Sequence, residues 1–312
     1  MRRRDHGTNK VKRGWGKVLQ YWHLLEIKKG MLSLFGQNTA FTTGNTRSFN
    51  ASIMTIAPFK AVLAVAFLLA SCPVTAKEGT VPLPESPGTV LFVGNSFTFW
   101  NQGLWTHMQA LTAVRGEGLG AKTSHVVRGG ACLRVLWKRT KAKQAIAEGD
   151  YDVVVLQEDL PETKVADFHK YAALFDEHTR QAGSRLIFFM SWDYQRLNWI
   201  SMDEIIAEHQ RMARKLDAEV APCGYAWQRA MKERPNVNFY SRDREHQSWH
   251  GTLLNLYVIY STIYGESPEA LKFRPPEKSE VTAEEDAWLR RVAWASVQSW
   301  QQTMSQEKQK KQ

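Results

Sequence analysis

Short apolar runs and amphipathic stretches alternate along the chain from residue 89 onward. Runs rich in β-branched and aromatic residues predict strands, and apolar residues spaced three or four apart predict helices. The predicted strands are 89–93, 124–127, 152–156, 185–190 and 218–221, with a short extended piece at 236–240. The predicted helices are 104–114, 133–147, 165–182, 202–218, 251–264 and 283–303.

This order of elements predicts an α/β fold. Strands that alternate with helices of ten to fifteen residues form βαβ units, whose crossovers are right-handed and whose sheet is mainly parallel. We therefore expect a single domain over residues 88–305, with a sheet of about five strands between two helical layers. Residues 306–312, QEKQKKQ, are expected to be a solvated charged tail.

The region before this domain has a different pattern. Residues 61–70, AVLAVAFLLA, are uniformly apolar, follow Lys60, and are too short to span a bilayer, which is typical of a signal-peptide core. Two cleavage sites remain open: Leu69-Ala70-Ser71-Cys72 resembles a lipobox that would lipidate Cys72, and Val74-Thr75-Ala76 fits an ordinary signal peptidase. Residues 1–76 are therefore expected to be an extension plus signal segment, with Met54 a possible true start, and 77–87 a linker.

Charge and cysteine content narrow the class of protein. The chain carries a formal net charge of +10, but residues 1–60 hold 11 Lys and Arg against two acidic residues, which leaves the rest nearly neutral. A nucleic-acid partner is therefore not expected. We expect an exported protein, periplasmic, secreted or lipid-anchored, whose membrane contact would come only through Cys72. Cys132 and Cys223 are expected to be free thiols and not a disulfide framework.

Reactive residues follow several of the predicted strands directly. Ligands of open parallel sheets bind beyond the carboxyl ends of the strands, so residues in these positions are expected to meet at one edge. They are Ser96, Gly129 and Gly130, Gln157 and Glu158, Ser191 to Asp193, and Asp243 with His246.

These residue types suit nucleophilic catalysis on an ester. A serine needs a base, and His246 can serve, with Asp243 three residues earlier to orient it. The backbone N–H groups of Ser96 and Gly130 and the side-chain amide of Gln157 are candidate donors to an oxyanion. Asn95, Trp192 and Asp193 are expected to line the substrate, and Asp193 is a second candidate for orienting the base.

Four segments together resemble the SGNH/GDSL hydrolase superfamily, in its bacterial branch whose first block reads GNSFT. They are GNSFT, RGGACL, VVVLQE and D-x-x-H-x-S-x-x-G, within residues 88–270. The resemblance implies a flavodoxin-like three-layer α/β/α domain without a cofactor or metal. It assigns Ser96 as nucleophile, Gly130 as oxyanion glycine, and Asp243 and His246 as acid and base.

The chain departs from the family pattern in two blocks. The third block is usually G-x-N-D, and residues 156–159 read LQED, so we assign the missing amide to Gln157. The last block is usually H-P-S, and Gln247 stands where the proline would be, from which we expect a looser turn.

The sequence favours a serine esterase that removes acyl groups, expected to be O-acetyl groups, from carbohydrate or a small molecule. One alternative is an inactive, exported glycan-binding protein that uses the Trp-rich edge, formed by Trp100, Trp105, Trp192 and Trp199. A second is a divalent metal shared by His246 and His250, four residues apart, although the sequence lacks an H-E-x-x-H motif.

Overall fold

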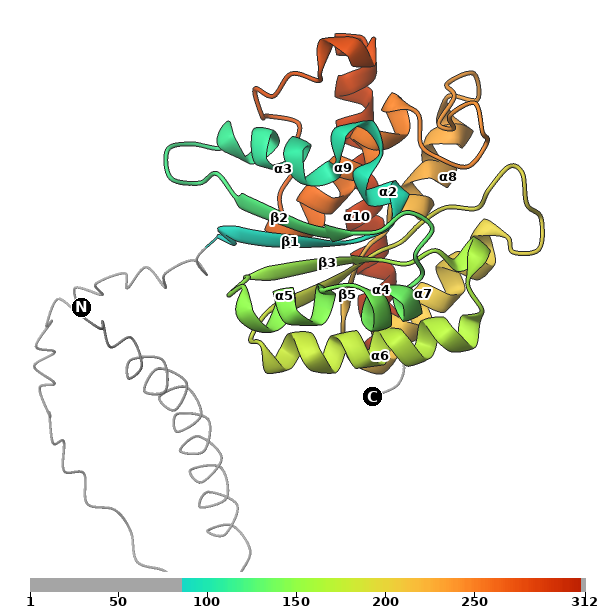
Figure 1. The fold of residues 1–312 in the computed structure, drawn as a ribbon. Helices are drawn as coiled ribbons and strands as arrows, with labels where there is room; N and C mark the ends of the chain where they lie inside the picture. Colours follow the sequence, from blue (N-terminus) through green and yellow to red (C-terminus); the bar gives the residue numbers. More distant parts are fainter. Residues whose placement is uncertain (1–85, 310–312) are drawn as a thin grey trace, which may run out of the picture. The chain divides into compact units, whose positions relative to one another are not determined.

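The computed structural model describes residues 86–309, so the expectations for the signal segment, Met54 and Cys72 lie outside the described residues. Within them, five strands form one parallel sheet in the order β2-β1-β3-β4-β5 (Figure 1). The strands are β1 (Thr89–Gly94), β2 (Lys122–Val127), β3 (Val153–Gln157), β4 (Arg185–Phe189) and β5 (Glu219–Ala221). This order is that of flavodoxin-like folds, so the predicted fold class is confirmed.

The three central strands are the most buried, as their sequences predict. Every residue of β3 is buried, and in β1 and β4 only the first residue is partly exposed. No residue of the edge strand β2 is buried: each is exposed or half-buried. Gly94 pairs with Val127, and Gln157 with Phe189, so the carboxyl ends of β1 to β4 lie along one edge.

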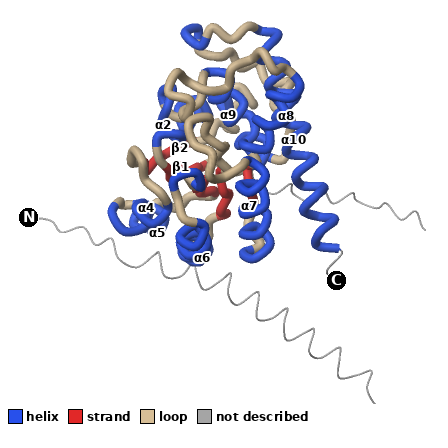
Figure 2. Tube along the Cα trace, turned by 90° about the vertical axis from the view of Figure 1, so that its right-hand side faces the viewer, coloured by secondary structure: helices blue, strands red, loops and turns tan. Residues whose placement is uncertain are grey.

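Helices cover both faces of the sheet (Figure 1). On one face lie α3 (Leu104–Ala113), α8 (Cys223–Glu233), α9 (Trp249–Tyr264) and α10 (Ala283–Gln309), together with the four-residue α2 (Ser96–Phe99). On the other lie α4 (Leu133–Arg139), α5 (Ala142–Glu148), α6 (Val165–Gln181) and α7 (Met202–Leu216). Figure 2 looks onto the edge where the strands end, and loops gather there.

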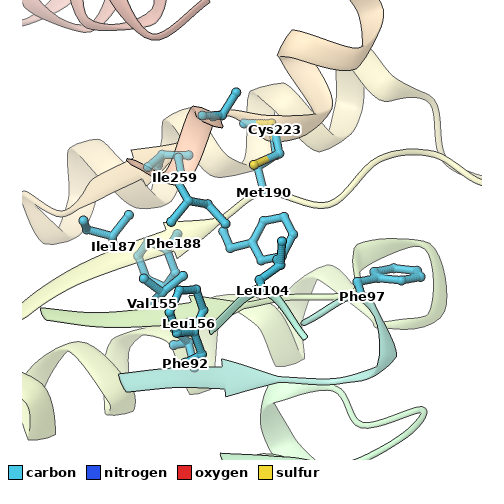
Figure 3. Close-up of a cluster of buried hydrophobic side chains, with 14 of the residues drawn as sticks. Phe92, Phe97, Leu104, Val155, Leu156, Ile187, Phe188, Met190, Cys223 and Ile259 are labelled. Carbon is cyan, nitrogen blue, oxygen red and sulfur yellow. The ribbon is translucent and has the colours of Figure 1, made fainter. Parts of the chain in front are cut away.

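The helix α9 occupies the centre of its layer. Thirteen of its 16 residues are buried, which explains why its sequence is apolar nearly all round. Its residue Ile259 lies near Ile187 and Phe188 of β4 in a core that also holds Met190 and Cys223 (Figure 3). Cys223 is a free thiol, as predicted, and so is Cys132.

The structure corrects several predicted boundaries. The helix expected over 133–147 is broken at Thr140, whose hydroxyl donates to the Leu136 carbonyl and accepts from the Ala142 N–H. The sequence pattern does not predict α8, because Pro222 and Gly224 at its start are residues typical of turns. Residues 236–240 form no strand, only an isolated bridge between Tyr240 and Gln247.

The last helix is longer than predicted. It continues to Gln309, through the first part of the segment expected to be a tail. Within residues 86–309, no helix has the length and apolar character needed to cross a membrane.

Candidate active site

The turn after β1 presents Ser96 at the first position of α2. Asn95 caps this helix, because its side-chain oxygen accepts from the Phe97 N–H at 3.0 Å. The turn is tight enough to require a glycine at 94, where a Cβ would lie 2.1 Å from the Thr98 hydroxyl. Backbone N–H groups at the start of a helix favour negative charge, so this position suits a serine whose carbonyl adduct becomes an oxyanion.

Gln157, at the end of β3, holds this turn from the inside of the protein. Its Oε1 accepts from the Asn95 N–H at 2.7 Å, and its Nε2 donates to the Glu158 carbonyl at 2.8 Å. The side chain is fully buried. Both polar groups of the Gln157 side chain are thus engaged inside the protein, so this geometry does not support its predicted role as amide donor to an oxyanion.

Asp243 and His246 form the pair that the sequence predicted. Asp243 Oδ2 lies 2.8 Å from His246 Nδ1, and its Oδ1 accepts from the backbone N–H groups of Glu245 and His246, both at 3.0 Å. Burial raises the pKa of the Asp243 carboxyl, but the hydrogen bonds from His246 and the two N–H groups outweigh it and hold that pKa below its usual value. Asp243 is thus an ionised partner at neutral pH.

The imidazole of His246 lies against the segment that carries Ser96. Its ring stacks on Trp100 with a centroid separation of 4.1 Å and meets the Phe97 ring edge-on at 5.4 Å. Its Nε2 is buried and has no hydrogen-bond partner among the described residues. The Ser96–His246 hydrogen bond is therefore not formed here, and Nε2 is left without a competing partner.

Gln247 ties the same loop to α2. It is fully buried, and its Nε2 donates to the Phe97 carbonyl at 2.8 Å. The expectation that the loss of proline would loosen this turn is wrong, because the glutamine supplies a hydrogen bond that proline cannot make.

Gly130 follows β2 beside the same turn. A Cβ at the preceding Gly129 would lie 3.8 Å from the ring of Phe99 in α2, so this loop and α2 are neighbours. Gly130 has φ +61°, a left-handed conformation that a glycine adopts without strain, and it is exposed. Its N–H stays a predicted second oxyanion donor.

Two of the three predicted substrate-lining residues are closed off. Asn95 and Trp192 are 1% and 0% exposed. Trp192 stacks on Trp227 at 4.1 Å and donates from Nε1 to the Glu245 carbonyl at 2.9 Å, so it supports the loop of His246 from behind. The sequence alone predicts a substrate-lining role for Trp192, because an aromatic residue near a strand end can either line a substrate site or pack in the core.

Asp193 is half-buried and accepts hydrogen bonds from Tyr240, at 2.9 Å on its carbonyl and 3.3 Å on its side chain. Burial raises the pKa of its carboxyl, against the lowering effect of the Tyr240 hydroxyl. His246 is oriented by Asp243 and not by Asp193.

Sequence reasoning missed a set of buried acidic and polar groups beneath the turn. Asp159 accepts from the Asn95 Nδ2 at 2.8 Å and from the Tyr194 hydroxyl at 2.5 Å. Burial raises its pKa to about 6, against these two hydrogen bonds. Burial likewise raises the pKa of Glu158 to about 7. The only sequence signal was the acidic pair at the end of a strongly apolar strand.

The metal alternative gains no support from the geometry. His246 Nδ1 is engaged by Asp243, and His250 Nε2 lies 3.2 Å from Glu285 Oε1 on another helix. In the described part of the chain, no three His, Cys, Asp or Glu side chains are grouped so as to hold an ion.

No protein-family model and no curated protein matches the sequence. Among solved structures, the chain is similar to a DUF4886 family protein from Bacteroides uniformis, with 14% identity over 67% of this chain and 94% of that one and a TM-score of 0.51. At this identity the similarity shows a shared fold.

The matches also include SGNH and GDSL hydrolases at low sequence identity. A candidate SGNH hydrolase from Slackia heliotrinireducens is 22% identical over 57% of this chain and 99% of its own, with a TM-score of 0.48. Axe2, an acetylxylan esterase from Geobacillus stearothermophilus, is 16% identical over 57% of this chain and 94% of its own, also with a TM-score of 0.48.

Proposed function

We propose that this protein is a serine esterase of the SGNH type that removes O-acetyl groups from carbohydrate. The observation that carries the proposal is the Asp243–His246 pair, whose imidazole packs on Phe97 and Trp100 in the segment that follows Ser96. The residues that we assign as nucleophile, base and orienting carboxylate come from two segments far apart in the sequence, which supports the proposal.

The first half-reaction forms an acyl-enzyme. His246 Nε2 takes the proton of the Ser96 hydroxyl while the Ser96 oxygen attacks the ester carbonyl, and Asp243 stabilises the imidazolium that results. The Ser96 and Gly130 N–H groups donate to the oxyanion, each worth roughly 3 kcal/mol of transition-state stabilisation. The imidazolium then protonates the leaving sugar oxygen, and the C–O bond breaks.

The second half-reaction hydrolyses the acyl-enzyme and regenerates free Ser96. His246 takes a proton from water, whose oxygen attacks the acyl carbonyl, and the tetrahedral adduct collapses with the proton passing to Ser96. Acetate and free serine result, so the cycle needs no cofactor.

A carbohydrate substrate is favoured by the rim of the site. Trp199, in the loop between β4 and α7, is 65% exposed and held by a hydrogen bond from its Nε1 to the Pro161 carbonyl at 2.6 Å. A fixed, open indole face at the edge where the strands end offers a stacking surface for a sugar ring.

The test compares wild type with Ser96→Ala on p-nitrophenyl acetate and acetylated xylan. Ser305→Ala, on the exposed side of α10, is the matched control. We expect Ser96→Ala to lose at least about 10³-fold in kcat, as triad removal does elsewhere, and the control to lose nothing. Activity of Ser96→Ala equal to the control would remove Ser96 from the mechanism.

The glycan-binding alternative rests on the same exposed Trp199. A covalent probe distinguishes it from the esterase. A fluorophosphonate labels a serine activated by its histidine, so labelling of wild type and not of Ser96→Ala supports the esterase. Binding of a glycan without any labelling supports the alternative.

We also propose that the protein acts after export, on the basis of the apolar segment 61–70 that follows Lys60. Cell fractionation of wild type and Cys72→Ala tests this and the lipid anchor together. A protein that remains in the cytoplasm in both forms would contradict export.

A further inference from the structure

Three elements converge on the buried carboxylate of Asp159. It lies just past β3 and is 4% exposed, and its two oxygens accept from Asn95 Nδ2 at the end of β1 and from Tyr194 in the loop after β4. A carboxylate costs free energy to bury unless it is paired. Here both partners belong to loops of the candidate site, and neither is a charged residue.

The Asn95 side chain connects Asp159 to the turn that carries Ser96. While its Nδ2 donates to Asp159, its Oδ1 accepts from the Phe97 N–H, the residue after Ser96. The orientation of the amide is fixed by Asp159, because a carboxylate can only accept. Asp159 therefore decides which atom of Asn95 caps α2.

The loop that carries Tyr194 links Asp159 to the other half of the site, because Arg196 of this loop lies over the Tyr194 ring. Arg196, two residues on, donates to Glu245 and to Glu162, both at 2.5 Å. Glu245 immediately precedes His246, and its carbonyl accepts from Trp192 in the same loop. One short loop thus connects Asp159 to the segment that carries the acid and base.

We propose that Asp159 is a positioning residue that sets the distance and angle between Ser96 and His246, through Asn95 on one side and Tyr194 on the other. It does not touch the substrate. This inference rests on the proposed function, and it predicts an effect on kcat with little effect on KM, because reacting groups must be aligned to within fractions of an ångström.

An exchange of two side chains tests the hydrogen-bond pattern itself. In Asn95→Asp alone, two carboxylates face each other, and in Asp159→Asn alone, one donor loses its acceptor. In the double variant Asn95→Asp/Asp159→Asn all three hydrogen bonds can form again, because the amide introduced at position 159 donates to the carboxylate introduced at position 95. We expect each single variant to lose about 10- to 100-fold in kcat and the double variant to recover most of it.

A second pair of variants separates positioning from stability. Tyr257 on α9 also donates to a buried carboxylate, Asp286 on α10, and shares no hydrogen bond or ring contact with residues 94–100 or 241–247 in the described part of the chain. Tyr194→Phe and Tyr257→Phe should lower the melting temperature alike. Only Tyr194→Phe should lower kcat and the rate of fluorophosphonate labelling, by about tenfold.

The outcomes distinguish the inference from the function beneath it. An active wild type whose exchange variants do not recover, or whose Tyr194→Phe behaves as Tyr257→Phe, overturns the positioning role. A wild type with no esterase activity and no labelling overturns the proposed function. In that case hydrogen exchange at the Phe97 N–H still tests whether Asp159 holds the turn. Exchange should be faster in Asp159→Asn than in wild type, and an unchanged rate would refute control of the turn by Asp159.

Discussion

The indole of Trp100 lies nearly parallel to the imidazole of His246, with the ring centroids 4.1 Å apart and the planes inclined by 20°. Trp100 is the fourth residue after Ser96, so the segment that carries the proposed nucleophile also packs against His246, the proposed base. Its backbone leads into Asn101, whose φ of +50° is left-handed, and the Asn101 side chain donates to Thr252 of α9 at 2.8 Å. The stack is therefore held by the scaffold and does not depend on the two rings alone.

Trp100→Ala should lower kcat by about tenfold. The stacked indole fixes the imidazole plane and stabilises the imidazolium that forms during attack, a cation–π interaction of about 0.5 to 2 kcal/mol. Steady-state kinetics on p-nitrophenyl acetate measures the effect. Trp100→Phe keeps an aromatic face and should retain more of the activity, and equal losses in both variants would contradict a role for the stack.

Asp243→Asn should lower kcat by about 10³- to 10⁴-fold with the fold intact, because an amide cannot stabilise the imidazolium. The circular-dichroism spectrum and the melting curve of the purified variant report on folding. Asp193→Asn provides the comparison, since Tyr240 and not His246 contacts that carboxyl. A larger loss in Asp193→Asn than in Asp243→Asn would reverse the two roles.

Gln247→Met should lower both the free energy of unfolding and kcat. The variant keeps the side-chain volume but leaves the buried Phe97 carbonyl without the Gln247 donor, at a cost of about 1 to 3 kcal/mol. Urea unfolding measures the free energy of unfolding. The value of kcat reports whether the loop of His246 still holds its position against α2. Unchanged stability would mean that water replaces the amide.

Glu158→Gln should raise the free energy of unfolding at neutral and alkaline pH, and not below about pH 4.5. Burial raises the pKa of Glu158 to about 7, so the folded state binds this proton more tightly than the unfolded state. The stability that the proton contributes is complete below the ordinary pKa of about 4.5 and is lost as the pH rises through about 7, by on the order of 3 kcal/mol.

Unfolding in urea at pH 5 and pH 8 measures the change. The free energy of unfolding of wild type should fall between these values more steeply than that of Glu158→Gln. Parallel pH profiles for the two proteins would show that Glu158 is not the group responsible.

The sequence predicted the strands and the edge where the reactive residues gather, because both follow from local patterns. The apolar run of β3 is buried on both faces, and Gly94 at the end of β1 forms the expected turn with Asn95 and Ser96. The pairing of Asp243 with His246 was also readable, since three residues separate them in a single loop.

The direction in which polar side chains point at the strand ends was not readable from the sequence. Gln157, Asn95 and Trp192 stand at strand ends, as substrate-binding residues do, yet all three are buried. Their orientation depends on partners 53 to 64 residues away, such as Asp159 for Asn95, which periodicity and spacing do not reveal.

The position of His246 next to α9 has a consequence for thermal behaviour. Only Gln247 and Ser248 separate it from the most deeply enclosed helix, and Ser248 caps that helix by accepting from the Gly251 N–H. The proposed general base is thus anchored to a helix that cannot loosen while the hydrophobic core stays intact. On warming, hydrolysis should persist until the whole domain melts and then vanish together with the tertiary structure.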